Sequence, residues 1–194
     1  TSSIDALVHA VESSLSPKAT EYTKLMGYKA IEMIINGYKK LVSEGMDKLP
    51  SMMESFLVAS NMAGFAFGTA GCGAVHALSY PLGGTYHVAH GESNYALFTG
   101  VLNKYMEKKS DGEIAKLNAY LAGLLGCDVK NVYVELENLL NRVLPKKPLH
   151  EYGVTDADTV TFTESVLKTQ GRLMANNFVS LEREDVLDIY KKLM

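Results

Sequence analysis

Residues 73–94 read GAVHALSYPLGGTYHVAHGESN, and this stretch contains two histidines, His76 and His90, fourteen positions apart. An apolar helical pattern leads into His76. Pro81 and the glycine pair that follows it are typical of a helix end and a turn. His90 then falls near the start of the next helical stretch. A helix end, a tight loop and a new helix start can bring the two imidazoles to one point.

A second pair of polar side chains lies at the start of the chain, in IDALVHAVES. Asp5 and His9 are four residues apart within residues 2–14, where apolar residues recur at helical spacing. Residues four apart lie on one face of a helix, so the carboxylate and the imidazole can point to the same place.

One carboxylate and three imidazoles together suit a divalent transition metal. Only a fold that joins the two segments can build such a site, because the pairs are far apart in sequence. Fe(II), Zn(II), Co(II) and Mn(II) all accept these ligands, and the sequence does not choose among them. A single histidine on a helix is more often packed or solvated than bound to metal, so the spacing alone leaves both interpretations open.

The rest of the chain is helical in pattern, and we predict one all-α domain, residues 1–194, with about nine helices. Residues 18–44 carry a helical apolar stripe, and residues 51–78 are predicted to form one long buried helix rich in glycine and alanine. Asn61 is the polar exception there; it either faces the cleft or is a buried amide with satisfied hydrogen bonds. No segment shows the alternation of a strand.

Composition favours a globular domain of the cytoplasm. The net charge of −3 is mild, and there are no long basic runs, so we expect neither a nucleic acid nor a membrane surface as partner. No stretch of the chain stands out as a membrane span. The two cysteines, Cys72 and Cys127, are read as free thiols, and Cys72 as a small buried residue rather than a ligand.

Three segments, including the histidine stretch at residues 73–94, carry a family resemblance. Residues 5–12 read DALVHAVE, and SNMAGFAFGTAG, residues 60–71, precedes the histidine stretch. The chain resembles the iron-containing alcohol dehydrogenases, whose metal-binding half carries Asp-Ala-x-x-His-Ala-x-Glu and, later, Gly-x-x-His-x-x-x-x-Pro-Leu-Gly and His-Gly-x-x-Asn. The resemblance covers essentially the whole chain. It implies the helical C-terminal half of a dehydroquinate-synthase-like fold, Fe(II) as the usual ion, and as metal ligands Asp5, His9, His76 and His90.

Within that family the chain is most similar to the 4-hydroxybutyrate dehydrogenase branch, through residues 76–95 and 173–194. The resemblance implies a small alcohol or aldehyde substrate, an NAD(P) cofactor and a homo-oligomeric full-length protein. The metal would lower the pKa of a bound alcohol, and the alkoxide would give hydride to the nicotinamide. The implied reaction converts 4-hydroxybutyrate to succinate semialdehyde.

The chain departs from the family at Tyr80, where many members have another histidine that helps to relay the alcohol proton. A tyrosine, with an ordinary pKa near 10, is a poor base at neutral pH. Another group, such as His87, or water would then relay the proton. Tyr80 can equally well be a side chain that only lines the pocket. His87 can equally well be a surface side chain of the loop.

Family members are about twice as long and carry an N-terminal nucleotide-binding domain with a Gly-Gly-Gly-Ser phosphate loop. This chain has no such loop, no Gly-x-Gly-x-x-Gly and no alternating strand–helix pattern. A proposed ligand also stands only four residues from Thr1, although terminal residues tend to fray. We therefore interpret the chain as a C-terminal half that is inactive alone, with NAD(P) held mainly by a domain absent from it.

Two other classes of function remain open. One is a helical metal-binding or oligomerisation module without catalysis. The other is a metal hydrolase with Glu12 or Glu92 as base, although both carboxylates are expected to be helix-surface charges. A requirement for nicotinamide would separate hydride transfer from hydrolysis. A substrate with a carboxylate also calls for a cation in the cleft, and the sequence does not show which Lys or Arg lies there.

Overall fold

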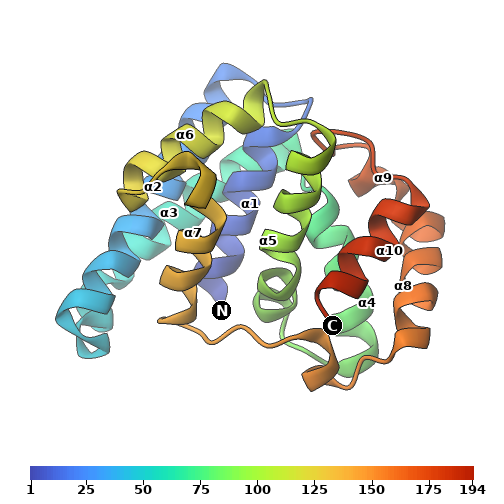
Figure 1. Ribbon diagram of the computed structural model, residues 1–194. Coiled ribbons are helices and arrows are strands. Elements are labelled where there is room, and N and C mark those ends of the chain that lie inside the picture. Colours follow the sequence, from blue (N-terminus) through green and yellow to red (C-terminus); the bar gives the residue numbers. More distant parts are fainter.

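The computed structural model describes all residues from Thr1 to Met194, and it contains ten α-helices and no β-strand (Figure 1). This confirms the predicted all-α fold. The α-helices are α1 (Ser2–Leu15), α2 (Glu21–Glu44), α3 (Leu49–Ala70), α4 (Ala74–Tyr86), α5 (His90–Lys108), α6 (Glu113–Leu125), α7 (Val132–Asn141), α8 (Asp156–Thr169), α9 (Gly171–Met174) and α10 (Arg183–Lys192). Three 3₁₀ helices lie in the connections: η1 (Met46–Lys48), η2 (Val129–Asn131) and η3 (Leu149–Tyr152).

Helix α1 forms the centre of the fold. It packs against α2 and α3 and also against α5, and Figure 1 shows it in the middle of the molecule, with α4, α8 and α10 beyond α5. Ten of its fourteen residues are buried, as is typical of a helix covered on all sides. Leu7 and Val11 are fully buried, and each contributes about 1.5–3 kcal/mol by leaving water. The polar side chains of α1 are therefore held inside the protein.

The predicted single helix over residues 51–78 is wrong, because the chain breaks between α3 and α4 at residues 71–73. Gly71 has φ +78°, which a residue with a side chain rarely adopts. Two buried side chains bind the carbonyls freed by the break: Ser16 Oγ donates to the Ala70 oxygen (2.6 Å), and Asn176 Nδ2 donates to the Cys72 oxygen (3.0 Å). The break turns the chain so that the N-terminus of α4 faces α1.

Helix α4 does not end before Pro81, as the sequence predicted, but continues through it to Tyr86. The proline removes one backbone donor, and the buried hydroxyl of Tyr190 adds a hydrogen bond to the Leu78 carbonyl in the preceding turn (2.7 Å). The helix ends at His87, which has φ +55°. Histidine enters this left-handed region more often than most residues with a side chain.

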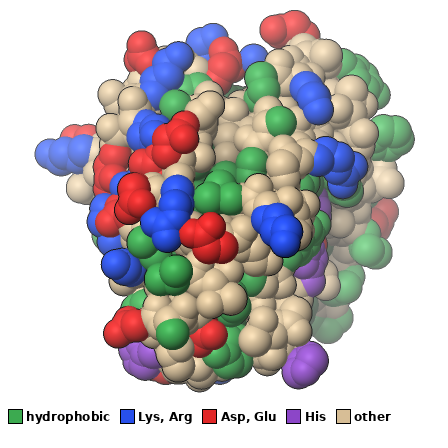
Figure 2. Space-filling view, turned by 90° about the vertical axis from the view of Figure 1, so that its right-hand side faces the viewer, with side chains coloured by type: hydrophobic (Ala, Val, Ile, Leu, Met, Phe, Trp, Pro, Cys, Tyr) green, Lys and Arg blue, Asp and Glu red, His purple; other side chains and the backbone are tan.

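Charges of both signs are interspersed on the surface rather than separated. Figure 2 shows this mixture on the face that lies to the right in Figure 1. Several of the charged groups pair between helices: Lys192 Nζ lies 2.8 Å from Glu107 Oε1, and Arg183 Nε lies 2.6 Å from Glu164 Oε1. Exposed pairs of this kind contribute about 0–1 kcal/mol each. None of the helices has the length and apolar character needed to cross a membrane.

Candidate metal centre

Helix α1 supplies two of the predicted ligands, Asp5 and His9, from adjacent turns. His9 Nδ1 lies 2.9 Å from the backbone oxygen of Asp5. A carbonyl oxygen only accepts, so Nδ1 carries the proton and Nε2 keeps its lone pair. The His9 ring also stacks on Phe67 of α3, with 4.2 Å between ring centroids, which fixes its plane. His9 is thereby held in the tautomer that a metal needs.

His76, in the first turn of α4, is oriented by Glu12 of α1. Its Nδ1 lies 2.6 Å from Glu12 Oε2, while Glu12 Oε1 accepts a 2.6 Å hydrogen bond from the Val75 backbone N–H. Glu12 is only 4% exposed and His76 only 2% exposed, so the prediction that Glu12 is a helix-surface charge is wrong. Nδ1 keeps its proton for Glu12, which leaves Nε2 as the nitrogen that can bind a metal.

His90 is the first residue of α5, and its Nε2 completes a three-residue cluster. Asp5 Oδ1 lies 3.6 Å from His90 Nε2 and 3.6 Å from His76 Nε2. The three ligand atoms lie within 4.8 Å of one another. His90 is half exposed, whereas His76 is buried, so this cluster has a buried side and an open side. An open side is what a catalytic metal site requires for its substrate.

The amide of Asn94 provides a test of whether these residues fit a cation. Its Nδ2 lies 2.6 Å from Asp5 Oδ1, 3.1 Å from His76 Nε2 and 3.2 Å from His90 Nε2. An amide nitrogen has two protons and cannot satisfy three such neighbours. Its Oδ1 is buried without a partner. The cluster thus holds more electron-rich atoms than its donors can satisfy, and a divalent cation fits that surplus.

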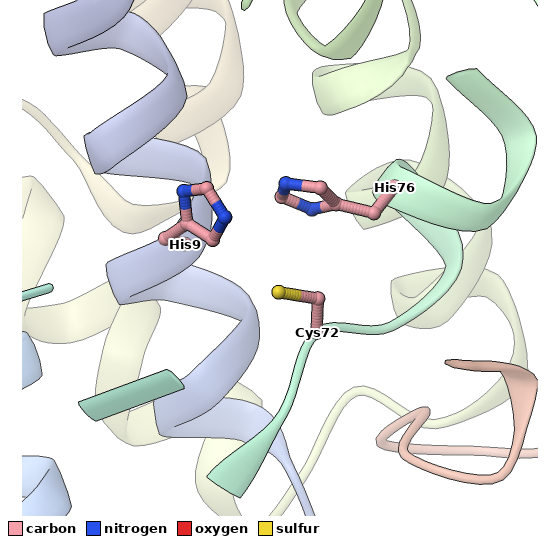
Figure 3. A group of neighbouring side chains, drawn as sticks. All are labelled: His9, Cys72 and His76. Atoms are coloured by element: carbon pink, nitrogen blue, oxygen red, sulfur yellow. The ribbon is translucent and has the colours of Figure 1, made fainter. Parts of the chain in front are cut away.

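His9, the fourth predicted ligand, lies beside this cluster. Its ring centroid lies 4.3 Å from that of His76, and its Nδ1 lies 3.7 Å from Asp5 Oδ2. Its ligand atom groups within 4.8 Å with those of Cys72 and His76 (Figure 3). Cys72 is buried, as predicted, but its thiol faces the two imidazoles instead of apolar neighbours alone. The four predicted ligands and Cys72 therefore form two overlapping groups that share His76.

The electrostatics of the cluster favour positive charge. Burial alone would lower the pKa of His76, but the nearby Asp5 carboxylate, the Cys72 thiol and the hydrogen-bonded Glu12 carboxylate raise it to about 12. Burial likewise opposes ionisation of Asp5, yet His76, His9 and Asn94 hold the pKa of its carboxyl below the ordinary value. The pKa of His9 is lowered, by burial first and by His76 second. In the absence of a metal, a second proton on the His76 ring supplies the positive charge that the carboxylates of Asp5 and Glu12 attract.

A cleft of about 350 Å³ opens over the cluster and contains His9, His76 and His90 in its wall. Tyr80 also lines it, 42% exposed, with its ring 6.1 Å from that of His90. His87 is exposed at the end of α4 and does not line the cleft. Asn61 is exposed on α3 beside a separate shallow hollow, so it neither lines this cleft nor is a buried amide.

The lining of the cleft also includes two cationic side chains and one unpaired hydrogen-bond acceptor. Lys18 and Arg172 both line it, both are exposed, and neither forms an ion pair with a carboxylate. Asn176 is 5% exposed, and its Oδ1 has no hydrogen-bond partner. The sequence could not identify these residues, because they come from the loop after α1 and from the segment around α9.

Comparison with known proteins shows to which family this chain belongs. The family model described as "Fe-containing alcohol dehydrogenase family, C-terminal" matches residues 1–194. The chain belongs to the iron-containing alcohol dehydrogenase family. It is 49% identical to the 4-hydroxybutyrate dehydrogenase of Clostridium kluyveri, covering 100% of this chain and 52% of that protein. It is 34% identical to long-chain-alcohol dehydrogenase 1 of Geobacillus thermodenitrificans, covering 97% of this chain and 48% of the relative.

Solved structures of this family show the same fold. A 1,3-propanediol oxidoreductase superposes with a TM-score of 0.84 at 25% identity, covering 99% of this chain and 50% of its own. An alcohol dehydrogenase from an archaeal halo-thermophilic Red Sea brine pool organism superposes with a TM-score of 0.87 at 22% identity, covering 99% and 49%. The chain therefore spans about half the length of the family members it matches.

Proposed function

We propose that this chain is the metal-binding half of an NAD(P)-dependent alcohol dehydrogenase that oxidises 4-hydroxybutyrate to succinate semialdehyde. The observation that carries the proposal is the convergence of Asp5 Oδ1 with the imidazole nitrogens of His76 and His90 at the cleft. Similarity to the 4-hydroxybutyrate dehydrogenase of Clostridium kluyveri supports the choice of substrate.

The ligands of the proposed metal are Asp5, His9, His76 and His90. Fe(II) is the ion that we expect, and Zn(II) or another divalent ion is the alternative; when bound, it supplies a Lewis acid that favours the ionised alcohol. Glu12 orients His76 through Nδ1, and Asn94 holds the Asp5 carboxylate. NAD(P) is held mainly by the part of the protein outside this chain.

Lys18 and Arg172 give the cleft its specificity for a hydroxy acid. A substrate with its hydroxyl at the ligand cluster can direct its carboxylate to these two cations, which no protein carboxylate neutralises. Arg172 can bind a carboxylate through two parallel hydrogen bonds. A hydrogen bond to a charged group contributes about 1.5–3 kcal/mol, which corresponds to a preference of about 10–150-fold over an alcohol that lacks the carboxylate.

We assign to Tyr80 the role of accompanying the alcohol proton out of the cleft. It lines the cleft beside His90, and its hydroxyl can both donate and accept a hydrogen bond. His87 lies outside the cleft lining, so its contribution to a proton relay requires intervening water. The unpaired thiols of Cys72 and Cys127 fit the cytoplasm, where we place the protein.

The proposal is tested in the full-length protein with 4-hydroxybutyrate and 1-butanol, which have the same number of carbons. We expect NAD(P)-dependent oxidation, with kcat/KM higher for the hydroxy acid by about 10–150-fold. Arg172→Gln should reduce that preference through KM, whereas Arg142→Gln, outside the cleft, should not. Turnover without a nicotinamide cofactor, or equal use of both substrates, would overturn the proposed function.

A further inference from the structure

We propose that binding of a carboxylate in the cleft and binding of the metal strengthen each other, and that Asn176 is the positioning residue that couples them. This coupling rests on the proposed function, which places the carboxylate of the substrate at Lys18 and Arg172. It would make the protein bind its metal more tightly when a hydroxy acid is present. The physical basis is that both ligands join the same two parts of the fold.

Asn176 holds the break between α3 and α4 through its side-chain amide. Its Nδ2 donates to the Cys72 oxygen at 3.0 Å, and the side chain is only 5% exposed. The amide occupies space that Gly71 leaves free, because a Cβ on Gly71 would lie 2.5 Å from Nδ2. Cys72 belongs to neither helix, so this hydrogen bond supplies the buried carbonyl with the partner that a helix would otherwise provide.

The position of the break decides the position of His76, which is the third residue of α4. Asn177 holds the residue next to Cys72. Its Oδ1 accepts from Tyr105 Oη at 2.9 Å, and a Cβ on Gly73 would lie 2.8 Å from the same oxygen. Metal–ligand distances must be met to within about 0.2 Å. A displacement of the break by a fraction of an ångström is therefore enough to weaken metal binding by His76.

Arg172 belongs to the same short segment as Asn176. The backbone N–H groups of residues 175–177 donate to carbonyls of α9 at 3.0, 2.9 and 3.3 Å, and α9 packs against α4. Arg172 and Asn176 therefore move together. The Oδ1 of Asn176 is buried without a hydrogen-bond partner, which destabilises the segment when no ligand is bound. A ligand that restrains Arg172 can thus stabilise the segment and the break that it holds.

The turn after α1 holds the other end of the break and carries the second cation of the cleft. Ser16 Oγ donates to the Ala70 oxygen at 2.6 Å and accepts from the Lys18 backbone N–H at 3.1 Å. Lys18 and Arg172 thus lie on the two segments that bind the carbonyls of this break, and both line the cleft. A carboxylate that binds both cations joins the two segments.

The carboxylate and the proposed metal restrict the same motion. A metal joins α1, through Asp5 and His9, to α4, through His76. The carboxylate joins the turn after α1 to the segment that holds the N-terminus of α4. Whichever ligand binds first orders this contact, and the second ligand binds without that cost. Such coupling is reciprocal, and it typically changes each affinity by about 5–150-fold.

The coupling is measured in the full-length protein without nicotinamide, with Zn(II) as the metal and butyrate as the carboxylate. Butyrate has the carboxylate of the proposed substrate but not its hydroxyl. Competition with a chelator should show Zn(II) affinity raised at least about fivefold by saturating butyrate, and calorimetry should show butyrate affinity raised by the same factor by Zn(II). In Arg172→Gln, butyrate binding and the enhancement should both be lost.

Asn176→Leu keeps the shape of the side chain and removes its hydrogen bond to Cys72. Without metal, this variant should bind butyrate with wild-type affinity, whereas butyrate should raise its Zn(II) affinity by less than about twofold. The matched control is Asn138→Leu, at an exposed amide of α7 outside the cleft, which should keep the full enhancement. Circular dichroism and melting temperature show that each variant is folded, and Asn176→Ala serves if Asn176→Leu is not.

Equal Zn(II) affinity with and without bound butyrate would overturn the coupling. So would an undiminished enhancement in folded Asn176→Leu, which would show that butyrate binds the metal directly. Both results would leave the dehydrogenase assignment standing if the full-length protein oxidises 4-hydroxybutyrate. Failure of butyrate to bind the metal-free protein would instead overturn the roles of Lys18 and Arg172 in the proposed function, and the coupling with them.

Discussion

Substitution of Glu12 by glutamine tests how the protein prepares His76 for a metal. The carboxylate accepts two hydrogen bonds of 2.6 Å, one from the Val75 backbone and one from His76 Nδ1. Glutamine has a single side-chain oxygen, so its amide nitrogen must face one of these donors. The neutral His76 ring, which is the form that binds a metal, can relieve that conflict by carrying its proton on Nε2, the nitrogen that the metal needs.

The expected magnitudes follow from these contacts. Loss of an orienting partner of this kind weakens metal binding by about 10–100-fold, which is about 1.4–2.7 kcal/mol. Where the buried Val75 N–H is left unpaired instead, the metal-free chain loses about 1–3 kcal/mol of stability. For a domain of 194 residues, each kcal/mol lowers the melting temperature by about 2–4 °C.

Metal affinity is measured by competition with a chelator, stability by calorimetry of the metal-free chain, and the site of the His76 proton by nitrogen NMR shifts of the Zn(II)-loaded chain. The control is Glu92→Gln, which makes the same charge change at a more exposed carboxylate that accepts from Tyr152 Oη at 3.0 Å. The reasoning is refuted if Glu12→Gln binds metal with wild-type affinity while His76 keeps its proton on Nδ1.

Three further predictions follow from the structure. Because its pKa is raised, the His76 ring carries a second proton at any pH below about 12, and a metal must displace that proton. The apparent metal affinity should therefore rise about tenfold from pH 7 to pH 8, with proton release visible in calorimetry. A metal affinity that does not change with pH would contradict this. Asn94→Ala should weaken metal binding by about 10–100-fold with helical content unchanged; unaltered chelator competition would count against its role. In thermal melts, Gly37→Ala should destabilise the chain by about 1–3 kcal/mol, because the added Cβ would lie 2.8 Å from the Phe56 ring. Gly64→Ala, which has open space around it, should instead stabilise the chain by about 0.5–1 kcal/mol. Equal effects of the two substitutions would show that the packing assignment is wrong.

Local pattern was enough to predict the helices and the grouping of polar residues on α1. Asp5 and His9 stand four apart on one helix, and that spacing does place them together. Local pattern failed between α3 and α4, because apolar periodicity continues through the break. The break depends on Ser16 and Asn176, which bind its carbonyls from distant parts of the chain.

The roles of the remaining site residues could not be predicted, because those roles depend on tertiary contacts. Glu12 has the sequence signature of a helix-surface charge, and only the approach of α4 makes it a buried partner for His76. Asn94 is the last residue of the His-Gly-x-x-Asn motif at residues 90–94, and that motif was the available signal for it. Lys18 and Arg172 are separated by most of the chain, and nothing in their neighbours points to a common cleft.

The most direct test of the central claim, that this chain builds a divalent metal site, is the metal content of the purified chain. Elemental analysis is compared among the wild type, an Asp5→Ala/His76→Ala double variant and a His87→Ala control. We predict close to one Fe or Zn per chain in the wild type and the control, and none in the folded double variant. Metal retained by the double variant, or absent from a folded wild-type chain supplied with Fe(II) and Zn(II), would contradict the account.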